Sequence, residues 1–195
     1  DQSGNTNHAV QTTPANQPKI VEGGSLVTNE AGKVSVKTEK GNFMLLDSTI
    51  TLSSAFSLFG VIDADNDTSY PDSGNNPLLG KYNTNTQFLG IGNDDEVSPN
   101  TFSIRFNGQS PLTVNEGDIG FGLTSARTYI YNGSTVSGFD DGSNTFEITA
   151  SGVFTSNMIF ARSFAVEDFE TFKGTVAELI IYPSDQSDNR TAIEA

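Results

Sequence analysis

Cysteine and tryptophan are absent from the 195-residue chain, and histidine occurs once, at His8. Without cysteine there can be no disulfide, no thiolate nucleophile and no zinc–thiolate centre. A single histidine excludes a metal site built from several histidines and argues against a Ser-His-Asp triad. An ordinary core must therefore stabilise the protein, and a single domain of this length can bury enough surface to supply one.

Basic residues are also scarce, since 10 Lys and Arg face 24 Asp and Glu, which gives a formal charge of -14 and a pI of about 4.2. A polyanion such as nucleic acid needs a basic stripe, and an anionic membrane surface needs similar basic charge. The apolar runs near residues 176–182 are far shorter than the roughly 18–20 residues of a membrane-spanning helix. The sequence therefore predicts neither a nucleic-acid partner nor membrane insertion.

The composition favours an all-β chain, with 19 Gly, 14 Phe and only 17% charged residues. Short β-type runs alternate with turn clusters, and no βαβ rhythm or internal repeat is visible. The near-continuous apolar run at residues 55–62 predicts a strand buried on both faces. Asn132-Gly133 predicts a tight hairpin, because both residues tolerate positive φ. The remaining predicted strands cover residues 19–21, 33–38, 42–46, 50–52, 78–80, 87–92, 101–107, 118–124, 126–131, 134–137, 145–149, 157–161 and 174–182.

This pattern predicts a two-sheet antiparallel β-sandwich at residues 19–195, preceded by an irregular polar arm at residues 1–18. Pro183 ends the last strand, and Ser184 is expected to cap a short helix over residues 185–195. No secretory signal is visible at the start. The chain opens in a loop and its helix lacks a C-terminal cap, so we expect the domain to be incomplete at both ends.

Two segments carry a resemblance to a known family. The stretch DQSGNTNHA with NQPKIV, at residues 1–9 and 16–21, is similar to the opening of concanavalin A-like, laminin-G-like jelly-roll domains. The stretch FKGTVAELIIYPSDQSDNR, at residues 172–190, resembles their last strand and helix. The resemblance implies a jelly-roll fold across the whole chain. Family members commonly extend further at both ends, which agrees with an incomplete domain.

The resemblance is less specific for function, since such domains serve as lectins, adhesion modules, glycoside hydrolases and parts of phage particles. The wording YPSDQS-NR resembles domains of marine bacteria and of phage tail, fibre and decoration proteins. It also resembles the catalytic domain of arabinofuranosidase B-type enzymes, but residues 159–164 contain no acid that could match that family's catalytic carboxylates. The Glu-x-Asp-x-x-Glu motif of laminarinase-type jelly rolls is also missing, which argues against a hydrolase of that type.

The loop after residue 62 begins like a calcium loop, with Asp63, Asp65 and Asp67 at positions 1, 3 and 5. Thr68 and Gly74 occupy positions where an EF-hand needs Gly and Glu, so an EF-hand is excluded. An irregular calcium site that adds Asp72 remains a candidate, and Ca²⁺ is the one cofactor that the sequence suggests. A solvated acidic turn is the alternative interpretation.

Sugar sites usually combine an aromatic platform with polar loop groups. Tyr70, Tyr82, Asn83 and Asn85 form such a polar-aromatic stretch and are the candidate carbohydrate-binding residues. Most other aromatics are phenylalanines, which we expect to pack in the core, at positions 43, 56, 59, 88, 102, 106, 121, 146, 160 and 172.

Glu178 interrupts the apolar strand at residues 174–182. Strict alternation would place it on one face with Val176, Ile180 and Tyr182. Glu178 could act as an acid in a cleft, although pairing with a neighbouring Arg or a position on the outer face of the sheet is the stronger interpretation. Other acids cluster in predicted turns, at residues 94–96 and 140–141, and are interpreted as solvated.

The leading functional hypothesis is a non-enzymatic structural and recognition module on an extracellular assembly, first of all a phage virion, as a decoration, fibre or tail component. A bacterial cell surface is the alternative location. Its expected partners are other subunits of that assembly and surface polysaccharide. The alternatives are a glycoside hydrolase of arabinofuranosidase or glucanase type, with Glu178 and a loop acid as its pair, and a calcium-dependent lectin.

Overall fold

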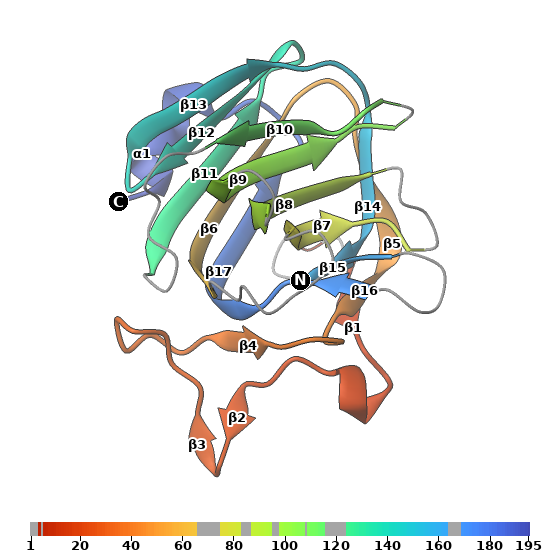
Figure 1. Cartoon of the computed structure of the whole chain (residues 1–195), viewed down its shortest axis with the longest axis vertical. Helices are drawn as coiled ribbons and strands as arrows, with labels where there is room; N and C mark the ends of the chain where they lie inside the picture. Colours follow the sequence, from red (N-terminus) through yellow and green to blue (C-terminus); the bar gives the residue numbers. More distant parts are fainter. Residues whose placement is uncertain are drawn as a thin grey trace.

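The protein consists of two antiparallel β-sheets packed face to face, as shown by a computed structural model that describes all residues except 1–3, 5, 66–74, 83–86, 95–97, 108, 116–123 and 164–168 (Figure 1). The seven-stranded sheet has the order β1 (Ala9–Val10), β5 (Met44–Leu52), β14 (Phe154–Ile159), β7 (Asn75–Gly80), β8 (Phe88–Asp94), β9 (Ser98–Arg105) and β10 (Leu112–Asn115). The six-stranded sheet has the order β13 (Ser143–Thr149), β12 (Thr135–Asp140), β11 (Ser125–Tyr131), β6 (Phe56–Ala64), β17 (Gly174–Tyr182) and β4 (Val36–Thr38). Two smaller sheets pair β2 (Val21–Glu22) with β3 (Ser25–Leu26), and β15 (Ala161–Ser163) with β16 (Phe169–Thr171). The expected two-sheet β-sandwich is confirmed.

The core lies between the two large sheets and is mainly aromatic. Phe102 stacks on Tyr129 and on Phe146, with ring centroids 4.6 and 4.9 Å apart. Every phenylalanine that the sequence assigned to the core and that the structure describes is buried. Only Phe121 of that set lies outside the described residues. The core prediction is therefore confirmed wherever it can be compared.

Strand β6 is buried on both faces, as its apolar run predicts. Phe56, Leu58 and Ile62 point into the core. On the opposite face, the Phe59 ring meets the Tyr182 ring edge-on at 5.9 Å, and Ser57 is fully buried. This double coverage explains why the segment lacks polar alternation.

The predicted hairpin at Asn132-Gly133 joins β11 to β12. The Asn132 side-chain oxygen accepts the backbone N–H groups of Ser134 and Thr135, and Gly133 has φ +98°. The Tyr131 hydroxyl donates to the Gly133 carbonyl at 2.9 Å. The turn prediction is confirmed, although β12 begins at Thr135, one residue later than expected.

Strict alternation along the last strand is wrong, because β17 contains a bulge. Its register against β6 shifts between Val176, which pairs with Ile62, and Glu178, which pairs with Val61. Val176 therefore faces the core together with Leu179 and Ile181, while Glu178 is exposed. One extra residue reverses the faces of all that follow it.

The C-terminal helix is shorter than predicted, and Ser184 does not cap it. A 3-10 turn at Ser187–Asn189 leads into α1 (Arg190–Ile193), and neither has a side-chain cap. The reason lies upstream, where the Ser57 hydroxyl donates to the Ser184 carbonyl and accepts the Gln186 N–H. The backbone around Ser184 is thereby tied to β6. Helix α1 then lies behind β12, with its Arg190 guanidinium 4.2 Å from the centre of the Phe139 ring (Figure 1).

The segment predicted as an irregular arm includes an edge strand. Ala9 and Val10 pair with Leu46 and Leu45 of β5, and the His8 carbonyl accepts the Asp47 N–H at 3.0 Å. The prediction for the partner strand β5 is also wrong. Residues 42–46 and 50–52 were predicted as separate strands, but β5 runs unbroken from Met44 to Leu52 through its polar middle.

Other strand boundaries also differ from the sequence prediction. Strands β3, β10 and β16 were not predicted at all, and β4 begins only at Val36. The predicted strand at residues 157–161 is divided between β14 and β15 at Phe160, whose φ of +66° breaks the extended backbone. The predicted strand at residues 118–124 falls almost wholly outside the described residues. In the described part of the chain, no helix is long and apolar enough to cross a membrane.

Candidate functional site

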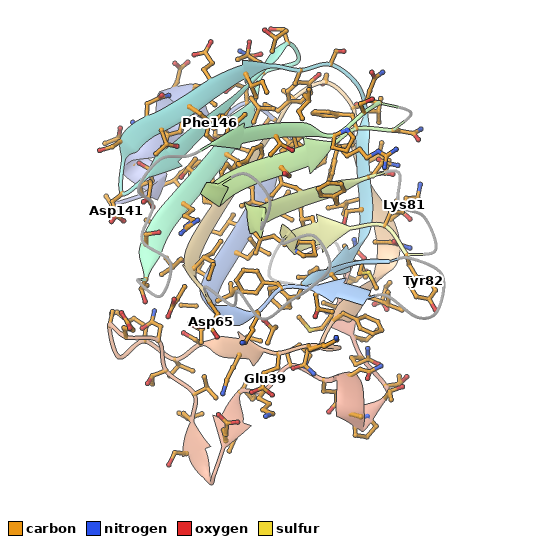
Figure 2. The ribbon with its side chains drawn as sticks, in the orientation of Figure 1. Glu39, Asp65, Lys81, Tyr82, Asp141 and Phe146 are labelled. Carbon is orange, nitrogen blue, oxygen red and sulfur yellow. The ribbon has the colours of Figure 1, made fainter. Side chains whose placement is uncertain are left out.

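Tyr82 is the candidate sugar-binding residue that the structure describes, and its side chain is available to a ligand. The residue follows β7 and is 40% exposed. Its backbone N–H donates to the Asn157 side-chain oxygen at 2.8 Å, which fixes the segment to β14. The ring therefore projects from an anchored backbone (Figure 2). Tyr70, Asn83 and Asn85, the other predicted carbohydrate-binding residues, lie outside the described residues.

A polar network adjoins Tyr82 and connects three strands. The Lys81 Nζ atom donates to the Thr155 hydroxyl at 3.1 Å, and that hydroxyl lies 2.9 Å from the Gln87 side-chain oxygen. Gln87 is 1% exposed, so the network rests on a buried anchor below the surface. We call Lys81, Tyr82, Gln87, Thr155 and Asn157 the tyrosine patch.

A hollow with a volume of about 220 Å³ opens near the start of β14. Among the described residues, its lining mixes apolar and hydrogen-bonding side chains and contains no carboxylate: Phe106, Gln109, Ser110, Leu112, Thr149, Ala150 and Ser151. Only four positions separate Ser151 of the hollow from Thr155 of the tyrosine patch. An extended chain covers at most about 14 Å over that distance. The backbones of the hollow and of the patch are therefore close at these two positions.

The predicted calcium ligands are described only in part. Asp63 is the last outward-facing residue of β6, and Asp65 follows the end of that strand. Asp67 and Asp72 lie outside the described residues. Partial burial raises the pKa of Asp63, and the negative charges of Glu30 and Asp65 raise that pKa further. The Arg127 guanidinium acts in the opposite direction.

Within the described part of the chain, no three Asp, Glu or His side chains stand close enough together to hold a metal ion. Asp65 instead makes a long ion pair with Lys173, at 3.7 Å. Asp63 and Asp65 alone are too few ligands for Ca²⁺, which takes six to eight oxygens. Any calcium site at this loop would need additional oxygens from the backbone, from water or from the rest of the loop.

Glu178 is exposed on the outward face of β17, opposite to the core. This is the position that the stronger of the two sequence interpretations predicted. A carboxylate that acts in glycoside hydrolysis faces a second one across a cleft. The exposure of Glu178 gives it no such enclosure within the described structure.

Two groups of polar residues in these sites were not predicted from the sequence. Gln87, Thr155 and Asn157 meet Lys81 and Tyr82 only through pairing of distant strands, with up to 75 positions between partners. Gln109 and Ser110 line the hollow from an unremarkable loop. One signal was available for the first group, because Gln87 and Thr155 are polar residues that border apolar strand segments.

Arg127 is a further polar residue that the sequence did not single out. It is 1% exposed and lies on the core side of β11 with Tyr129 and Tyr131. Its Nε atom donates to the Ser125 hydroxyl at 3.0 Å. Such burial makes it a structural residue rather than a surface ligand contact.

Neither a family model nor a curated protein sequence matches the chain. Solved structures do. The chain is similar to domain 4 of AbnA, an extracellular GH43 arabinanase from Geobacillus stearothermophilus solved with arabinotriose, with a TM-score of 0.58 and 12% identity over 83% of this chain and 76% of that one.

It is also similar to the enzymatically active domain of tailspike protein 2 from bacteriophage CBA120, with a TM-score of 0.59 and 15% identity. That match covers 97% of this chain but only 30% of the tailspike chain. A third similar structure is the carbohydrate recognition domain of Emp47p, with a TM-score of 0.52 and 12% identity over 92% of this chain and 89% of that one. At such low identities the likeness concerns the fold alone, and the chain shares the jelly-roll, lectin-like β-sandwich fold of these domains.

Proposed function

We propose that this domain is a non-enzymatic glycan-recognition module that binds surface polysaccharide through the tyrosine patch. The observation that carries the proposal is Tyr82, whose ring is exposed while its backbone is fixed to Asn157. A rigid aromatic ring binds the apolar face of a pyranose at a low cost in conformational entropy. Lys81 and Thr155 lie beside it and offer hydrogen-bonding groups for hydroxyls.

The similar structures support a sugar ligand. Two of the three similar structures named above are described by their own sugar binding: the arabinanase domain by bound arabinotriose, and the Emp47p domain as a carbohydrate recognition domain. Those descriptions concern other proteins. They nevertheless favour oligosaccharides as the first ligands to test here.

An extracellular assembly, most specifically a phage virion, is the proposed location. Its support is the tailspike match, which covers nearly the whole of this chain and leaves most of the tailspike for other parts. Mass spectrometry of purified particles and of cell fractions would test this location. Detection in a cytosolic fraction alone would reject it.

The absence of enzymatic activity is also part of the proposal. It is supported by the exposure of Glu178 and by a hollow whose described lining residues include no carboxylate. The protein should leave aryl arabinofuranosides and β-glucan intact. Hydrolysis that disappears in Glu178→Gln would instead favour a glycosidase.

Binding to a panel of arabinan-derived oligosaccharides and bacterial polysaccharides tests the recognition proposal directly. For a ligand that binds, Tyr82→Ala should weaken the affinity about tenfold or more, because it removes the stacking surface. Tyr82→Phe should keep most of the affinity, since the ring remains. Saturation-transfer NMR or calorimetry would measure both effects.

Gln109→Ala in the hollow is the matched control for the patch. It should change affinity less than Tyr82→Ala does. If Tyr82→Ala binds as well as the unchanged protein, the tyrosine patch is not the binding site. A loss confined to Gln109→Ala would place recognition in the hollow instead.

A further inference from the structure

Residues 19–40 form a segment that contains β4, the edge strand of the six-stranded sheet, and that projects below the sandwich with the β2–β3 hairpin at its end (Figure 1). Seven large hydrophobic side chains are exposed among the described residues, and four of them belong to this segment: Ile20, Val21, Leu26 and Val34. Such a concentration of exposed aliphatic side chains is characteristic of an interaction surface.

Three of these side chains share one face of the segment. Val21 is the direct cross-strand partner of Leu26, and Thr28 pairs with Val34. Leu26 and Thr28 are two positions apart and therefore point to the same side. We call Val21, Leu26 and Val34, which are 51%, 59% and 56% exposed, the hairpin face.

The opposite side of the segment is held against the protein. Val27, Asn29 and Ser35 are only 9%, 6% and 2% exposed. The Val27 N–H donates to the Ile20 carbonyl, and the Ser35 N–H donates to the Val27 carbonyl, both at 3.0 Å. The hairpin face is therefore directed outward by a bonded backbone.

The charge of this segment differs from that of the remaining chain. Residues 19–40 contain four lysines and three glutamates, a net charge of +1, while all other residues contain six basic and 21 acidic side chains, a net charge of −15. Lys19 pairs with Glu22 and Glu39 at 3.0 Å each, and Lys37 pairs with the same two glutamates at 2.9 and 3.3 Å. The segment is thus nearly neutral, and four of its seven charged side chains pair with one another.

We propose that the hairpin face binds a second copy of this chain, face to face across a two-fold axis. Most other approaches of two copies bring acidic surfaces together and are opposed by repulsion. Contact through the projecting segment buries aliphatic side chains, meets no net repulsive charge and keeps the two acidic sandwiches apart.

A strongly acidic partner suits the segment less well. Lys19 and Lys37 already bind two glutamates, so little positive charge is left to attract it. The two possibilities respond to salt in opposite ways. Salt screens repulsion between acidic bodies and strengthens the proposed dimer, whereas it weakens attraction between a cationic and an anionic surface.

Sedimentation equilibrium over a range of protein concentrations, at low and high NaCl, tests the proposal. We expect a monomer–dimer equilibrium that shifts toward the dimer as salt rises. The double variant Val21→Glu, Leu26→Glu should weaken dimerisation by a factor of ten or more. Val153→Glu changes an exposed aliphatic residue in the loop before β14 and should leave it intact.

Thermal melting of each variant controls for folding. The substituted side chains are exposed, so only a modest loss is expected, from the two carboxylates that face each other across the hairpin of the double variant. A monomer at all concentrations and salt conditions would overturn the proposal. Growth into open-ended oligomers would also overturn it, since a two-fold contact closes at the dimer. So would dimerisation that survives the double variant, or that Val153→Glu weakens to the same extent. None of these outcomes depends on glycan binding.

Discussion

Gly133 combines a left-handed backbone with a crowded environment at the β11–β12 turn. Its φ is +98°, and a Cβ added there would lie 2.7 Å from the Ser54 carbonyl oxygen. Gly133→Ala should therefore lower the free energy of unfolding by about 1–3 kcal/mol, because both the backbone and the contact become strained. Urea denaturation followed by fluorescence would measure the change.

Gly24, in the β2–β3 turn, is the matched control for Gly133. It has a similar φ of +84°, but a Cβ there would meet nothing within 4 Å. Gly24→Ala should lower the free energy of unfolding less than Gly133→Ala does, because only the backbone strain remains. Equal losses would show that the approach to Ser54 contributes nothing.

Asp63 gives a pH-dependent prediction. Burial and the nearby Glu30 and Asp65 charges raise its pKa above the ordinary value of 3.8. A carboxyl with a raised pKa binds its proton more tightly in the folded state, so it favours folding at low pH and disfavours it as the pH rises through its folded pKa. Asp63→Asn should therefore raise the melting temperature at pH 7, and this gain should disappear below pH 3.8.

Bound calcium would reverse the expected effect of Asp63→Asn on the melting temperature at neutral pH. If Asp63 contributes to a calcium site, millimolar Ca²⁺ should stabilise the unchanged protein, EDTA should remove the effect, and Asp63→Asn should abolish it. Melting curves in Ca²⁺ and in EDTA would distinguish the two cases. Identical curves would exclude a calcium site that contributes to stability, and the acidic loop would then be a solvated turn.

At the scale of strands, the sequence predicted those features that depend on local pattern. The apolar run of β6, the phenylalanine core and the Asn132-Gly133 turn all follow from side chains close together in sequence. Bulges were not predictable in this way. In β17 the register shift after Val176 depends on the partner strand, and it reverses which residues face the core.

Strand β5 shows that local sequence can also suggest a break where the strand continues. Its polar middle, residues 47–49, was interpreted as a break between two strands. The Asp47 N–H donates to the His8 carbonyl, and the Ser48 N–H donates to the Asn7 side chain. These partners lie about forty positions away, so local sequence could not show that the strand continues.

The candidate site, like the strands, was predicted only in part from the sequence. Tyr82 could be identified as a potential sugar platform, because a tyrosine in a polar loop is chemically suggestive. Its anchor at Asn157 and the Thr155–Gln87 contact required knowledge of which strands lie beside β7. The order of the strands in the sheet, which brings distant residues together, determines this site more than any local motif does.

At the scale of the whole molecule, charge is distributed unevenly between two parts. The sandwich and its loops contain nearly all of the acidic excess, whereas residues 19–40 are close to neutral. The projecting segment is therefore the place where a second copy meets the least repulsion. The tyrosine patch lies at the side of the sandwich, away from that segment (Figure 2). The two proposed surfaces could therefore function at the same time.

The net charge of -14 also predicts how salt affects stability. Repulsion among 24 acidic side chains destabilises the compact state, and NaCl shortens the screening distance from about 10 Å at 0.1 M to about 3 Å at 1 M. The melting temperature should therefore rise with NaCl. Measurement at protein concentrations where the chain is monomeric separates this effect from dimerisation. Sucrose of equal osmolality is the control, because it does not screen charge, and it should not reproduce the full rise. A melting temperature that falls with NaCl would show that the lysine–glutamate pairs of the projecting segment, which salt weakens, contribute more to stability than the acidic repulsion removes.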